Sequence, residues 1–82
     1  MRKYDPNYTE EFRDEQLRWF EERMDRLPVS LQYSVSSKSI DLRKTVESLS
    51  HLLRSNKPSV TFSGYMETLL QIKEKLQADG LQ

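Results

Sequence analysis

The chain has 82 residues, of which 35% are apolar and 32% charged, with equal numbers of acidic and basic side chains. It contains no cysteine, which excludes disulfides, thiolate metal sites and a cysteine nucleophile. So short and polar a chain can form one small domain with a thin core, and a second copy would bury more apolar surface. We therefore expect a homodimer.

The N-terminal stretch MRKYDPNYTEEF lacks the apolar segment of a signal peptide. No apolar run in the sequence reaches the roughly 18 residues of a membrane span. We expect a cytoplasmic protein with no membrane association.

Residues 7–27 are predicted to form the first helix. Asp5 or Asn7 can cap it, Pro6 suits a first turn, and Pro28 stops it. Apolar side chains recur at helical spacing and give a wide, aromatic face. They are Tyr8, Phe12, Leu17, Trp19, Phe20, Met24 and Leu27.

The next segment, 29–42, alternates apolar and polar residues. Val29, Leu31, Tyr33 and Val35 are separated by single polar residues, which is typical of a strand. The same residues also fit a serine-rich linker, and the sequence leaves both interpretations open.

Two further helices are predicted, at 41–55 and 61–79, because apolar residues again recur at spacings of three and four. Asn56 is expected to end the first of them in a left-handed conformation, before Pro58. Gly80 is expected to end the second, with Leu81 folding back on Leu76.

The predicted fold class is mainly α, with three amphipathic helices and a short strand within 29–42; the alternative is a plain three-helix bundle. Two divisions of the chain fit this pattern. Either 1–27 is an N-terminal amphipathic aromatic helix attached to a strand-helix-turn-helix unit at 28–82, or 1–82 is a single small helical domain.

Residues with catalytic potential are scattered rather than grouped. The one histidine, His51, falls on the polar face of its predicted helix without a second histidine or a cysteine nearby, so we expect no metal site. The serines have no base that spacing assigns to them, and the acidic residues alternate with arginines on an exposed face. We expect no enzyme activity, no cofactor and no small-molecule substrate.

The order strand, helix, turn, helix across residues 35–78 resembles the ribbon-helix-helix family of DNA-binding proteins. SIDL would end the strand, RKTVESLSHLL would be the first helix, SNKPSV the turn and TFSGYMETLLQI the second helix. The resemblance implies that two chains pair their strands into a ribbon that enters the major groove. The second helix would then hold a phosphate at its start.

On that resemblance, the strand and both helix starts would contact DNA. The implied DNA-binding residues are Lys38, Ser39, Arg43, Lys44, Ser59 and Thr61; in the other strand register Ser30, Gln32 and Ser34 would face the bases. The segment 28–60 is the basic part of the chain, with five basic and two acidic side chains. The strand departs from the family in carrying serines where Lys or Arg is usual.

The alternative function is a three-helix protein-interaction or adaptor module that binds no nucleic acid. In this alternative the aromatic face of the first helix would be core, and any part left over would form a protein-binding or dimer patch; as an appendage of the strand-helix-turn-helix unit, the face would instead dock on the dimer or on a protein partner. The residues of this face are Tyr8, Phe12, Trp19 and Phe20.

Overall fold

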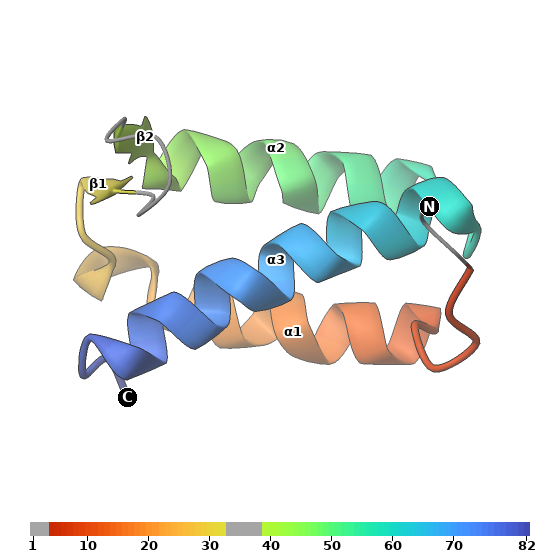
Figure 1. Ribbon diagram of the computed structural model, residues 1–82, viewed down its shortest axis with the longest axis horizontal. Helices are drawn as coiled ribbons and strands as arrows, with labels where there is room; N and C mark the ends of the chain where they lie inside the picture. Colours follow the sequence, from red (N-terminus) through yellow and green to blue (C-terminus); the bar gives the residue numbers. More distant parts are fainter. Residues whose placement is uncertain (1–3, 33–38) are drawn as a thin grey trace.

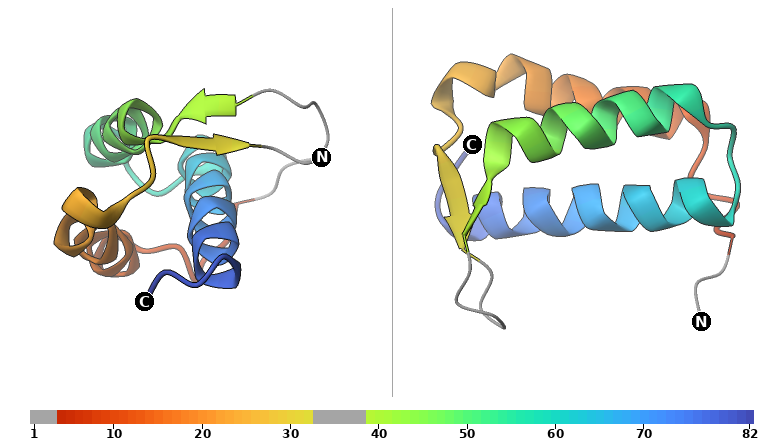
Figure 2. Two further views of the ribbon diagram at one scale, coloured as in Figure 1. Left: turned by 90° about the vertical axis from the view of Figure 1, so that its left-hand side faces the viewer. Right: turned by 90° about the horizontal axis from the view of Figure 1, so that it is seen from above.

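The computed structural model describes residues 4–32 and 39–82, which form three helices with a short hairpin at one end (Figure 1). Seen along the bundle, the helices lie at the corners of a triangle (Figure 2). The elements in chain order are α1 (Glu10–Glu22), the 3₁₀ helix η1 (Met24–Arg26), β1 (Ser30–Gln32), β2 (Ser39–Asp41), α2 (Leu42–Ser55) and α3 (Val60–Ala78). The mainly helical fold with three helices confirms that part of the prediction.

Helix α1 begins at Glu10, three residues later than the predicted start at residue 7. Thr9 is its N-cap, because its hydroxyl accepts a hydrogen bond from the Phe12 amide at 3.1 Å. The predicted caps, Asp5 and Asn7, lie in the turn before it, where the Asp5 carboxylate accepts from the Asn7 amide at 2.8 Å. The choice of Asp5 or Asn7 was therefore wrong: a local Asx turn uses the carboxylate that capping would need.

The segment before α2 forms two short strands. β1 and β2 pair antiparallel, with Leu31 opposite Ile40, and the Leu42 amide continues the contact by donating to the Val29 carbonyl at 3.2 Å. One edge of β2 is thus paired within the same chain. The remainder of the alternating segment, 33–38, lies outside the described residues.

Side chains cap both remaining helices at their starts. The Asp41 carboxylate accepts from the Lys44 amide, and the Ser59 hydroxyl accepts from the Phe62 amide. The predicted left-handed conformation of Asn56 was wrong, since Asn56 is extended, with φ −120°. Its side-chain amide instead donates to the Leu52 carbonyl at 2.7 Å, and this gives a hydrogen-bond partner to one of the carbonyls in the last turn of α2.

The predicted end of α3 is confirmed. Gly80 has φ +101°, and the Leu81 amide donates to the Leu76 carbonyl at 3.0 Å while the Gly80 amide donates to the Gln77 carbonyl. These are the two hydrogen bonds of a Schellman motif. Leu81 packs against the core beyond the turn.

All three helices and the loop after α1 contribute to one core. Its buried apolar residues are Leu17, Phe20, Leu27, Leu42, Val46, Leu49, Leu53, Phe62, Met66, Leu69, Ile72 and Leu76. Two polar contacts tie distant segments to it: the Asp5 amide donates to the buried Ser63 hydroxyl at 3.0 Å, and the Arg13 guanidinium donates to the Leu53 carbonyl at 3.2 Å. Across residues 4–32 and 39–82, no helix has the length and apolar character needed to cross a membrane.

Candidate functional site: a groove between α1 and α2

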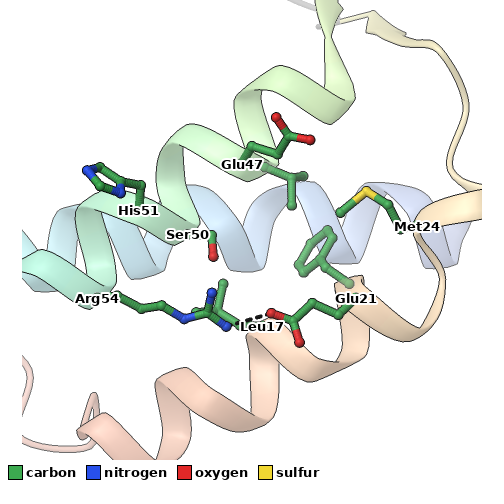
Figure 3. A pocket seen from close by; sticks show the side chains of 9 residues that line it. Leu17, Glu21, Met24, Glu47, Ser50, His51 and Arg54 are labelled. Atoms are coloured by element: carbon green, nitrogen blue, oxygen red, sulfur yellow. Dashed lines mark hydrogen bonds and ion pairs between the residues drawn. The ribbon is translucent and has the colours of Figure 1, made fainter.

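A groove of about 320 Å³ lies between α1 and α2 (Figure 3). Its floor is lined by Leu17 and Phe20 of α1 and Val46 of α2, which are nearly fully buried, and by Met24 of η1, which is half-buried. Its rim is polar and is made by Glu21 of α1 and by Glu47, Ser50, His51 and Arg54 of α2.

The spacing of residues on the two helices explains why the groove exists. Leu17, Phe20 and Met24 are three and four residues apart, so they share one side of the chain. On α2, Ser50 lies one turn from Val46, within the buried stripe that continues to Leu53. Ser50 is half-buried, and its small side chain leaves space that a leucine at this position would fill.

One ion pair crosses the groove from helix to helix. The Arg54 guanidinium donates to the Glu21 carboxylate (Figure 3). Both side chains are 52% exposed, so the pair contributes at most about 1 kcal/mol to stability. A ligand can therefore displace this bridge at little cost.

The remaining rim residues add an acidic group and an imidazole. Glu47 and His51 are exposed on α2, one turn apart. Together with Glu21 and Arg54 they surround an apolar floor with separate acidic and basic groups. This arrangement suits a ligand that is apolar on one side and charged at its edges.

The described part of the chain contains no cluster of three or more side chains able to hold a metal ion. Within residues 4–32 and 39–82, the one clearly shifted pKa is that of Tyr8, in the N-terminal turn and away from the groove. Burial there raises the pKa of Tyr8 above 10.0, and the nearby carboxylates Asp5 and Glu67 raise it further.

The predicted DNA-binding residues fall at the two ends of α2. Arg43 and Lys44 are exposed in its first turn, shortly after the strand β2 that begins at Ser39, whereas Ser59 and Thr61 lie past its other end. The 14 residues of α2 span about 21 Å between these groups. The Ser59 hydroxyl is already used as the α3 cap. The sixth predicted residue, Lys38, lies outside the described residues.

The predicted partner-binding aromatics have different environments. Tyr8 and Phe12 stack on each other, with ring centroids 5.8 Å apart, and are partly buried, as is Trp19. Phe20 is fully buried in the core, as the three-helix-bundle alternative expects of this face, and it offers a partner no exposed surface.

Sequence reasoning did not identify the rim of the groove. Glu21 comes from α1 and Ser50 and Arg54 come from α2, and only the packing of the two helices brings them together. One signal was present in the sequence: Ser50 is a small polar residue next to the apolar stripe of Val46, Leu49 and Leu53. A residue of this kind in a stripe marks a place where two helices leave space.

The chain belongs to the family described as "Domain of unknown function (DUF6965)", whose family model matches residues 14–78. The matched region contains nine of the 13 residues of α1 and the whole of β1, β2, α2 and α3, and with them every residue that lines the groove. No curated protein and no solved structure matches the chain.

Proposed function

We propose that this protein is a non-catalytic interaction module that binds an amphipathic helix of a partner protein in the groove between α1 and α2. The observation that carries the proposal is the apolar floor bordered by charges of both signs. A helix in this position would lie against two helices at once, as a fourth member of the bundle.

The groove sets the size and pattern of the ligand. Its floor extends along the chain from Leu17 in α1 to Met24 in η1, and the part within α1, from Leu17 to Glu22, is about 9 Å of helix. That length accommodates two apolar side chains one turn apart on the incoming helix. An acidic side chain beside them would pair with Arg54, and a basic one with Glu21 or Glu47.

A site-specific photo-crosslinker tests this proposal in cells. Placed at the exposed rim position His51, it should give covalent adducts with a partner, whereas the same group at Gln77, exposed on α3, should not. Adding Ser50→Leu, which fills the groove, should remove the adducts at position 51. Equal adducts at both positions, or adducts that survive Ser50→Leu, would contradict binding in the groove.

DNA binding is the second candidate function, and one observation favours it. The order β2, α2, α3 follows the order expected of a ribbon-helix-helix unit, and the exposed Arg43 and Lys44 directly follow β2. One edge of β2 pairs with β1, which leaves its other edge for the strand of a second copy.

Duplex DNA titrated at two salt concentrations tests this candidate. Phosphate contacts make affinity fall steeply with salt, and removing one contact with Arg43→Gln or Lys44→Gln should lower the salt slope by about one. Glu74→Gln, on the exposed surface of α3, is the matched control. Absence of binding at low salt would exclude this function.

A further inference from the structure

A second cluster of polar side chains lies where α1 packs against α3, and it centres on the single tryptophan of the chain. The Arg23 guanidinium carbon lies 4.6 Å from the centroid of the Trp19 ring. The Lys73 ammonium, from α3, lies 5.2 Å from the same centroid. Two cations from different elements thus share one indole ring.

Both cations are held in place by groups that carry no charge. The Lys73 ammonium donates to the side-chain oxygen of Gln16 at 2.9 Å, and Gln16 is only 8% exposed. Arg23 donates through Nη1 to the Trp19 carbonyl at 3.0 Å. Neutral partners of this kind fix the positions of the two cations without cancelling their charge.

The cluster keeps unused hydrogen-bond donors. Arg23 Nε, a buried atom, has no acceptor within the described parts of the chain, and 21% of the Arg23 side chain is exposed. The ammonium of Lys73 has three donors, and Gln16 accepts from one of them. Within the described residues, one carboxylate lies within 4 Å of these two cations. It is that of Glu22, whose Oε1 is 3.9 Å from Arg23 Nη1, which is too long for a hydrogen bond.

We propose that Arg23 and Lys73, presented around Trp19, form a binding site for a carboxylate group carried by an apolar ligand. The planar guanidinium matches a carboxylate, and the indole ring offers an apolar surface to the group that bears it. Helix α1 itself carries six acidic and two basic side chains, which disfavours a doubly charged phosphate relative to a singly charged carboxylate. The site is separate from the groove, which lies on the α2 side of α1.

Because the chain has one tryptophan, its fluorescence and its indole N–H signal in NMR report on this site alone. Phenylacetate titrated at constant ionic strength should change both signals saturably. The neutral isostere phenylacetamide should have no saturable effect, and inorganic phosphate should bind more weakly than phenylacetate.

Lys73→Gln should weaken phenylacetate binding at least about tenfold, as expected for loss of one charge-assisted hydrogen bond. Lys75→Gln, two residues further along α3 and exposed, should leave it unchanged. The indole N–H signal of Lys73→Gln must stay dispersed, which shows that the variant is folded; if it does not, Arg23→Gln replaces it in the same titration. Equal binding of phenylacetamide, tighter binding of phosphate, or unchanged affinity in the folded variant would overturn the proposal.

Discussion

Deleting residues 1–27 should unfold the rest of the chain. The deletion removes α1 and Leu27, and with them three of the buried core residues: Leu17, Phe20 and Leu27. Burial of one such side chain contributes about 1.5–3 kcal/mol, so the three together contribute roughly 5–9 kcal/mol. A domain of 82 residues has a total stability of roughly 4–12 kcal/mol, of the same order as this loss.

The amide NMR spectrum of a 28–82 fragment tests this expectation. We expect poorly dispersed peaks or aggregation, because α2 and α3 would expose the apolar faces that α1 now covers and two short helices alone are marginal. Full-length Phe20→Ala is the companion variant, and it should lose about 3–5 kcal/mol of unfolding free energy while still folding in part of the population. A well-dispersed spectrum from the fragment would refute the reasoning and establish 28–82 as a separate unit.

Four further outcomes are expected. Leu49→Ala should lower the unfolding free energy by about 2–4 kcal/mol in urea, whereas the exposed Ser48→Ala should stay within about 0.5 kcal/mol of the wild type. Gly80→Ala should lower the melting temperature, because a φ of +101° strains any residue with a Cβ, although no neighbouring atom lies within 4 Å of the added carbon. Because the pKa of Tyr8 is raised in the folded chain, its stability contribution is fully present below the unfolded pKa of 10.0 and is lost as the pH rises through the higher folded pKa, so Tyr8→Phe should show a smaller loss of stability in alkaline urea titrations. Sedimentation equilibrium at micromolar concentration should show a dimer, and a species of 9.8 kDa alone would contradict the expected homodimer.

The sequence predicted the helices well where capping and apolar spacing agree. The bounds of α2 and α3 lie within one residue of those expected, because each apolar stripe begins beside a strong capping side chain, Asp41 or Ser59. The start of α1 was placed too early because Asp5, Asn7 and Thr9 are all good caps, and a local turn decides between them. The spacing of apolar residues does not show which of several neighbouring capping residues will start a helix.

The two candidate sites could not be predicted from the sequence as well as the helices. The groove depends on how α1 and α2 face each other, and the residues of its rim have ordinary exposed positions on each helix considered separately. The tryptophan cluster depends likewise on the rotation of α1 relative to α3, which brings Lys73 to Gln16 across 57 residues of sequence. Helical periodicity identifies which side of a helix is apolar, but it leaves open which neighbouring helix each polar edge will meet.

The hydrogen bond from Arg13 to the Leu53 carbonyl has a consequence for local opening of the structure. Carbonyls in the last turn of a helix have no partner within the helix, so this turn usually frays and exchanges its amide protons quickly. Here α1 supplies the missing partner, and Asn56 supplies one for the Leu52 carbonyl. The end of α2 should therefore exchange its amide protons slowly and in step with the first turns of α1, as one cooperative unit rather than as two independent helix ends.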